Sequence, residues 1–223
     1  MKTTAAKEVS QSMQVTTVLP TNYHRQATLD LSKNRKAVVG AIVSGIVLFI
    51  AVGWLLVQFT HFLRPTALEG IGFRDIVTIT ADGKLSGVLP SQLIVDAAVA
   101  LALVMLIHEL VHGVFYWRFA GQRPTFGIKG ILVYAAAPSE VYFPRNQYLI
   151  VGIAPLVLLT LVGLLLMVIV PVVVVPILML FIAFNAAGAA GDLLMVACLL
   201  SYSPDTLMQD NGSGVIVYGP EYS

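Results

Sequence analysis

The sequence predicts an all-α membrane protein with about four transmembrane helices and short β-rich extramembrane loops. Composition supports this class, because 57% of the 223 residues are hydrophobic and only 11% are charged, whereas soluble domains are about one quarter charged. Four long apolar stretches and an alternating pattern in the loops are the other supporting observations. The formal net charge of +1 says little about partners, but no basic patch indicates nucleic acid, so we expect none.

Each apolar stretch is long enough to cross about 30 Å of hydrocarbon as a helix. The stretches cover residues 37–60, 93–117, 148–170 and 177–200. The last two are separated only by "PVVVVP", which is either a tight apolar turn or a kinked continuation. The first stretch begins too late and runs too long for a cleaved secretory signal, so we expect a retained anchor in a lipid bilayer.

The chain is predicted to form one membrane domain over residues 37–202, between two cytoplasmic tails. Residues 1–36 are rich in Ser, Thr, Gln and Lys, a composition typical of a mobile segment. Residues 203–223 form the second tail. Basic residues are more frequent before the first stretch and between the second and third, so the positive-inside rule places both termini in the cytoplasm.

Two loops carry strand signals. The segment "FRDIVTITADGKLSGVLP" alternates apolar and polar residues and contains Asp82-Gly83, which is typical of a hairpin turn. Near the C-terminus, "GSGVIVYGP" is a candidate for one more strand. We therefore expect a small hairpin after the first apolar stretch.

Ionisable residues are rare in the four stretches. The second stretch contains Asp96, His108, Glu109 and His112, the fourth contains Asp192, and the first and third contain none. Because an ionisable group in hydrocarbon costs a few kcal/mol, a functional role with named partners is the first interpretation.

The segment "HELVH" places His108 and His112 four residues apart, on one face of a helix. Two imidazoles so placed can point nitrogens at one ion about 2.0–2.1 Å away. Glu109 lies about 100° around the helix, where it can accept a proton from water on the metal without being a ligand. A structural His–Glu pairing would also lower the cost of burial, but it does not require this spacing.

Catalytic zinc commonly takes three protein ligands, and Asp192 is the predicted third ligand. It follows the small-residue run "NAAGAAGD", which lets helices approach closely. Asp192 and His108 each lie about fifteen residues from the outer end of their stretches, so their depths match. One dication together with Asp192 and ionised Glu109 sums to zero charge, which a site of low dielectric constant tolerates.

Alternatives remain for these assignments. One alternative role for Asp192 is helix packing, and Glu140 and His61 are competing third ligands. Asn185 lies two turns before Asp192 on the same face, where it would contact the oxyanion or the substrate, or instead form an interhelical hydrogen bond. Tyr116, one turn past His112, is more typical of an interfacial aromatic residue than of an electrophile.

An H-E-x-x-H motif in a membrane span, followed two spans later by an aspartate with an asparagine two turns before it, resembles the site-2 protease superfamily of intramembrane zinc proteases. More narrowly, the chain resembles a small bacterial family of zincin peptidases through "HELVHG", "GIKGILVYAAAPSEVYFPRNQYLIVGIAPL" and the later "GD". The resemblance covers roughly residues 93–218. It implies a bacterial cell membrane, zinc bound by His108, His112 and Asp192, and Glu109 as the general base.

The chain departs from the better-studied site-2 proteases at two motifs. Its "NAAGAAGDL" lacks their proline and the glycine after the aspartate, and "GIAPLVLL" lacks the asparagine of their G-P-x-x-N. Details of substrate handling are therefore not carried over.

The predicted function is that of a zinc-dependent intramembrane or membrane-proximal endopeptidase acting on membrane-protein substrates. The β-rich segment "TFGIKGILVYAAAP" is either an edge strand that pairs with an extended substrate or an ordinary hairpin. A non-catalytic metal-binding scaffold and an ion carrier are the alternatives. A carrier needs a polar route across the bilayer, for which Asp96 is the only residue on the outer side. The oligomeric state is left open.

Overall fold

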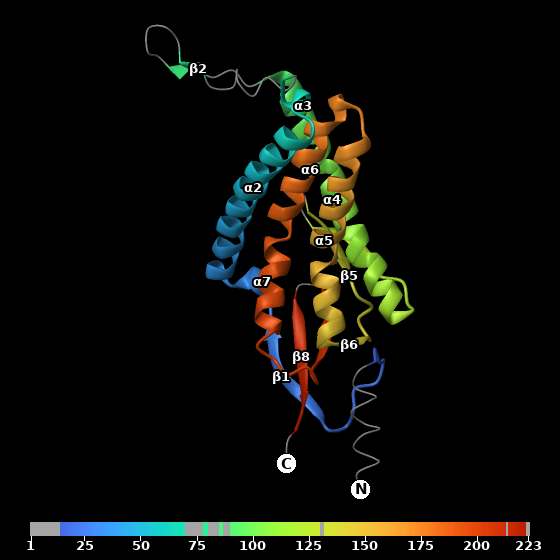
Figure 1. Cartoon of the computed structure of the whole chain (residues 1–223). Coiled ribbons are helices and arrows are strands. Elements are labelled where there is room, and N and C mark those ends of the chain that lie inside the picture. Colours follow the sequence, from blue (N-terminus) through green and yellow to red (C-terminus); the bar gives the residue numbers. More distant parts are fainter. Residues whose placement is uncertain are drawn as a thin grey trace. The chain divides into compact units, whose positions relative to one another are not determined.

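The computed structural model describes residues 14–69, 78–79, 85–86, 90–129, 132–212 and 214–221. The described chain is mostly helical and carries three small antiparallel sheets (Figure 1). Four helical segments are long and apolar enough to cross a membrane: α2 (Arg35–Leu63), α4 (Ser91–Ala120), α5 (Arg145–Ile169) and the segment Val172–Leu199. The mostly helical class with four such segments is therefore confirmed at the level of length and composition.

The chain divides into two compact units. Unit 1 contains Met1–Val43, Ile107–Pro155 and Ala189–Ser223, and unit 2 contains Ser44–Leu106 and Leu156–Gly188. Each unit is therefore assembled from segments that are far apart in the sequence.

A four-stranded antiparallel sheet in unit 1 has the order β1-β8-β7-β6. Its strands are β1 (Tyr23–Leu29), β8 (Val215–Pro220), β7 (Leu207–Asp210) and β6 (Tyr142–Pro144). Buried and half-buried residues alternate along β8, as expected for a strand with one face against a core. The strand expected in "GSGVIVYGP" is therefore present.

Strand β1 lies inside the segment predicted as a mobile tail. Its residues pair with β8 from Tyr23 to Leu29, with one irregularity between Arg25 and Ala27. The polar composition of "YHRQATL" gave no strand signal, because only Ala27 and Leu29 of this strand pack against the core. As an edge strand, β1 is held mainly by backbone hydrogen bonds, which do not depend on the side chains. Residues 1–13 lie outside the described residues.

The hydrophobic core of unit 1 joins the sheet to the helices on which the predicted site residues lie. Tyr116 of α4, Val151 of α5 and Leu199 of α7 (Ala190–Leu199) pack with strand residues. The whole cluster comprises Tyr116, Ala137, Val141, Phe143, Tyr148, Val151, Leu199, Met208, Val215 and Val217. The strands thus fix the separation of three helices in this unit.

A two-stranded hairpin of β4 (Thr125–Lys129) and β5 (Leu132–Ala136) also belongs to unit 1. Gly113 of α4 allows β4 to lie against this helix, because a Cβ atom there would be 2.3 Å from Cζ of Phe126. The hairpin is thereby placed next to the "HELVHG" turn.

In unit 2, short strands β2 (Thr78–Ile79) and β3 (Leu85–Ser86) pair antiparallel after α3 (Thr66–Glu69), as the sequence predicted. The turn between them, with Asp82-Gly83, lies outside the described residues.

The fourth predicted span is interrupted. "PVVVVP" is a tight turn with a short 3₁₀ helix, η2 (Val172–Val174), and α6 (Val175–Gly188) follows it. Helix α6 ends at Gly188 and α7 begins at Ala190, so residues 177–200 do not form one regular helix.

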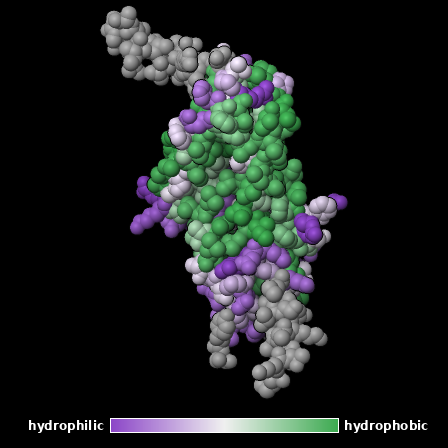
Figure 2. All heavy atoms as spheres, viewed as in Figure 1, coloured by the Kyte–Doolittle hydropathy of each residue, from purple (hydrophilic) through white to green (hydrophobic). Residues whose placement is uncertain are grey.

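Hydrophobic residues dominate the visible surface over the helices (Figure 2). In the most apolar window of α2 only 6% of the residues are buried. Large apolar side chains such as Ile50 and Trp54 are more than 60% exposed. Such a surface is unusual in water and fits an apolar solvent.

Candidate metal centre

Helix α4 brings together the three residues of the H-E-x-x-H motif. One ligand atom each from His108, Glu109 and His112 lies within 4.8 Å of the others. The centroids of the two imidazole rings are 4.9 Å apart, and both histidines are buried. The spacing i, i+4 therefore produces the shared face that the sequence predicted.

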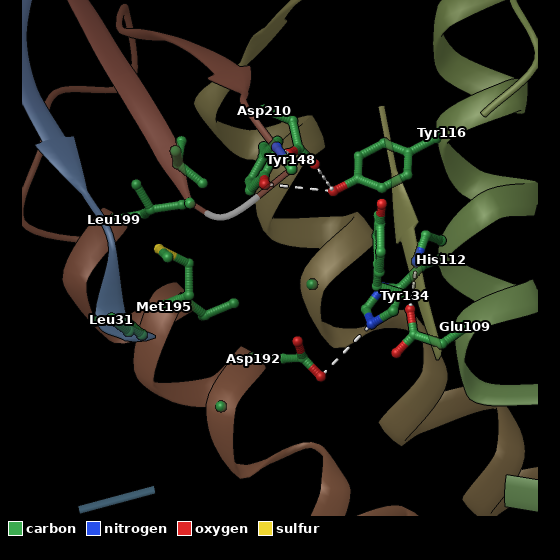
Figure 3. Close-up of a pocket in the computed structure, with 17 residues that line it drawn as sticks. Leu31, Glu109, His112, Tyr116, Tyr134, Tyr148, Asp192, Met195, Leu199 and Asp210 are labelled. Carbon is green, nitrogen blue, oxygen red and sulfur yellow. Dashed lines mark hydrogen bonds and ion pairs between the residues drawn. The ribbon is translucent and has the colours of Figure 1, made fainter. Parts of the chain in front are cut away.

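Asp192, in the first turn of α7, approaches both imidazoles, and Figure 3 shows it beside His112. Its Oδ2 atom lies 3.1 Å from Nε2 of His108 and 3.6 Å from Nε2 of His112. Gly152 of α5 permits this approach, because a Cβ atom there would be 2.9 Å from Cγ2 of Val196, one turn after Asp192. Residues 84 positions apart in the sequence thus converge in unit 1.

The separations of Asp192 from the two histidines fit a tetrahedral zinc ion. Two donor atoms about 2.0–2.1 Å from zinc at a tetrahedral angle are about 3.3 Å apart. The separations of 3.1 Å and 3.6 Å lie on either side of this value. Two imidazole nitrogens and one carboxylate oxygen would leave a fourth position for water.

The competing third ligands are placed elsewhere. Glu140 is exposed in the turn between β5 and β6, and His61 belongs to unit 2. Among the described residues, Asp192 is the acid that contacts both histidines. Its role as a ligand stays a prediction.

His112 is oriented by a carbonyl group of α5. Its Nδ1 atom lies 2.9 Å from the carbonyl oxygen of Val151. Pro155, inside α5, has no backbone N–H, so Val151 lacks the helical hydrogen bond that residue 155 would normally donate. Since a carbonyl only accepts, Nδ1 carries the proton and the lone pair of Nε2 is free for a metal. Sequence reasoning missed Val151, although a proline within an apolar helix was a usable signal.

Glu109 contacts the hairpin. Its Oε2 atom accepts a hydrogen bond from the backbone N–H of Ala135 in β5, at 2.8 Å. Glu109 is only partly buried, while the histidines beside it are buried. The predicted base therefore lies between the histidine face and one edge of the β4–β5 hairpin.

A second polar cluster lies one helical turn beyond His112. The hydroxyl of Tyr116 donates to Oδ2 of Asp210 at 3.0 Å, and its oxygen lies 3.3 Å from the hydroxyl oxygen of Tyr148. The backbone N–H groups of Ala137 and Gly212 also donate to Asp210, at 3.3 Å and 2.7 Å. Burial raises the pKa of the Asp210 carboxyl, and these hydrogen bonds act in the opposite direction.

Sequence reasoning missed this cluster. Asp210 lies in the segment predicted as a tail, where a single acid carries no local signal. Tyr116 was expected to be an interfacial aromatic residue, but it is only 5% exposed and belongs to the core. The contact depends on strand β7, which no local pattern indicated.

Asn185 belongs to unit 2 and is completely buried. Its Nδ2 atom donates to the carbonyl oxygen of Leu156 on α5 at 3.4 Å. This contact corresponds to the interhelical alternative, and a contact with substrate stays a prediction. Asp96, also in unit 2, is buried and accepts a hydrogen bond from Gln92 on its own helix at 2.8 Å.

One cavity of about 330 Å³ is shared by the two polar clusters of unit 1. Figure 3 shows Asp192 on α7 pointing toward Glu109 and His112 on α4, with Tyr116, Tyr148 and Asp210 at the far end. Tyr134 of β5 also lines the cavity. His112, Glu109 and Asp192 therefore face one common cavity.

Comparison with known proteins supports the same chemistry. Residues 101–207 match a family model with the description "Putative zincin peptidase". No curated protein and no solved structure matches the chain. The matched segment contains the H-E-x-x-H motif and Asp192, and it covers slightly less than half of the chain. Over this segment the chain is similar to the zincin peptidases.

Proposed function

We propose that the protein is a zinc-dependent endopeptidase embedded in a membrane. His108, His112 and Asp192 would hold the metal, and Glu109 would act as the general base. The observation that carries the proposal is the approach of one Asp192 oxygen to Nε2 of both histidines, at 3.1 Å and 3.6 Å. The match to the zincin peptidase model supports the reaction class.

When bound, zinc lowers the pKa of its water and polarises the peptide carbonyl. Glu109 would accept a proton from the attacking water and return it to the leaving amine. His112 is held in one tautomer by the Val151 carbonyl, which is 2.9 Å from Nδ1. Asp192 supplies the negative charge that, together with ionised Glu109, balances a dication in a poorly solvated site.

Strand β5 is the proposed docking edge for the substrate. Its Ala135 N–H points at Glu109, away from β4, so this edge runs beside the predicted base. An extended peptide added to β5 would present its carbonyl groups along the same line. A helical substrate would first have to unwind, because its carbonyl groups are occupied by helical hydrogen bonds.

Membrane embedding is supported by the four long apolar helical segments and by the exposure of their apolar side chains. Both termini face the cytoplasm in this proposal, from the distribution of basic residues. Membrane proteins with extended or partly unwound segments are the proposed substrates.

The test of the proposal is Glu109→Gln in the full-length protein reconstituted in lipid vesicles. Cleavage of a reconstituted single-span peptide and of a quenched fluorescent peptide library is expected to fall at least about 100-fold, as for loss of a general base. Zinc content should stay near that of the wild type, because Glu109 is not assigned as a ligand. Glu140→Gln, an exposed glutamate of the same unit, is the matched control.

Wild-type protein with full zinc that cleaves neither substrate would refute the peptidase proposal. Uptake of zinc into the vesicles, unaffected by Glu109→Gln, would instead favour a carrier. Equal cleavage by wild type and Glu109→Gln would remove Glu109 from the mechanism.

A further inference from the structure

The cavity lined by His112 and Asp192, two of the three predicted metal ligands, carries more acidic side chains than one metal ion would balance. Glu109, Asp192 and Asp210 line it, and neither a lysine nor an arginine is among its lining residues. A single dication would balance Glu109 and Asp192. The charge of Asp210 would then remain without a counterion, at the far end of the same cavity.

We propose that Asp210, Tyr116 and Tyr148 form a subsite for a primary ammonium group of the substrate. The inference rests on the proposed peptidase function and adds a substrate class to it. The ammonium group is either the N-terminus of the peptide or a lysine side chain.

The hydrogen-bonding capacity of the cluster supports this assignment. A carboxylate has about four acceptor positions, and Tyr116, Ala137 and Gly212 occupy three of those of Asp210. Because the one hydroxyl proton of Tyr116 goes to Asp210, the oxygen of Tyr148, 3.3 Å from that of Tyr116, retains its acceptor positions. An ammonium group has three donors and no acceptor, so it complements acceptors that remain around a buried acid.

The burial of Asp210 is also consistent with a cationic ligand. The side chain is only 8% exposed, and among the described residues no ion pair involves it. Burial raises the pKa of its carboxyl. A bound cation would offset the cost of keeping the carboxylate charged.

The separation from the metal centre sets the register of the substrate. His112 and Tyr116 are one turn apart on α4, which corresponds to a rise of about 6 Å. An extended peptide advances about 3.3 Å per residue, so this distance equals about two residues. A lysine recognised by the subsite should therefore lie next to the cleaved bond. An N-terminal ammonium group would lie about two residues from that bond, and the enzyme would then release dipeptides instead of cutting internal bonds.

The experiment uses four versions of one labelled octapeptide. They carry lysine or norleucine at one position beside the cleavage site, and a free or an acetylated N-terminus. Binding is measured by fluorescence anisotropy with full-length Glu109→Gln protein in detergent, and cleavage is measured with wild type. The ammonium group that the subsite recognises should strengthen binding at least about 10-fold, the usual contribution of a charge-assisted hydrogen bond, and the pair of peptides that shows the difference identifies the source.

Two further variants, each combined with Glu109→Gln, test the assignment. Asp210→Asn should reduce the preference to less than twofold, and Tyr148→Phe should reduce it partly while leaving the contact between Tyr116 and Asp210. Equal binding of all four peptides to the Glu109→Gln protein, which retains Asp210, would overturn the subsite. This result does not depend on whether Asp210→Asn folds. Preferential binding without cleavage by wild type would refute the peptidase function alone, and cleavage without preference would refute the subsite alone.

Discussion

Each unit of the protein has a cavity, and the two cavities differ in size and in chemistry. The cavity of unit 2 is about 650 Å³ and the cavity of unit 1 is about 330 Å³. The larger one has no ionisable residue in its lining and contains an aromatic contact, with the rings of Phe49 and Phe184 5.0 Å apart. The smaller one contains Glu109, His112, Asp192 and Asp210.

The comparison indicates that volume does not identify the functional site of this chain. An apolar cavity among membrane-spanning helices can be filled by lipid chains at little cost, so it requires no function. Buried acids and histidines in such helices are costly unless they act together or bind an ion. The chemistry of the lining therefore favours unit 1 as the place of the proposed function, and three pairs of matched substitutions test this proposal.

The largest effect is expected from a comparison of two acids, Asp192 in unit 1 and Asp96 in unit 2. Asp192→Ala removes the oxygen that lies within 3.6 Å of both histidines, and zinc affinity should fall at least about 100-fold, the upper limit for loss of an outer-shell partner. Asp96→Ala, which removes a buried acid of unit 2, should leave zinc affinity unchanged. Competition with a chromogenic chelator measures both values.

Two results would count against this comparison. Unchanged zinc affinity in Asp192→Ala would mean that Asp192 is not a ligand, and Glu140 and His61 would again be the candidates for the third ligand. A large loss of zinc in Asp96→Ala would mean that the acid of unit 2 also supports the metal.

The same contrast explains how much could be predicted from the sequence. The H-E-x-x-H motif was visible because both histidines lie on one helix, where local geometry fixes the spacing. The pairing with Asp192 could be expected from matching depth, since four apolar spans restrict the arrangement. Asp210 could not be predicted, because its contact with Tyr116 depends on the register of β7 within a sheet. Strand β1 was missed for a similar reason, since its partner β8 is almost 200 residues away in the sequence.

A smaller effect is expected from two helix prolines. Pro155→Ala restores a backbone N–H that competes with His112 for the carbonyl of Val151, now 2.9 Å from Nδ1. Zinc affinity should fall about 10-fold, the lower limit for an outer-shell change. Pro176→Ala should not alter it, because Pro176 lies in the first turn of α6, where a helix leaves its N–H groups unpaired.

For the two proline variants, chelator competition measures zinc affinity, and the imidazole signals of ¹⁵N-labelled protein report the tautomer of His112. Loss of affinity with an unchanged tautomer at His112 would contradict the explanation, even if the size of the effect were right. Equal effects of the two substitutions would point to general helix destabilisation.

The smallest effect on zinc is expected from two glycines of α5. Gly152→Ala would place Cβ 2.9 Å from Cγ2 of Val196 in unit 1, and Gly163→Ala would place it 2.6 Å from Cγ1 of Ile182 in unit 2. Both changes overpack a helix contact, which should lower the free energy of unfolding by roughly 1–3 kcal/mol. The replacement of glycine by alanine in a helix offsets part of this loss. Only Gly152→Ala should weaken zinc binding, by a few-fold, because Val196 and Asp192 share one face of α7. Thermal unfolding and chelator competition on both variants separate the two effects, and equal zinc affinities would show that the approach of α5 to α7 does not set the position of Asp192.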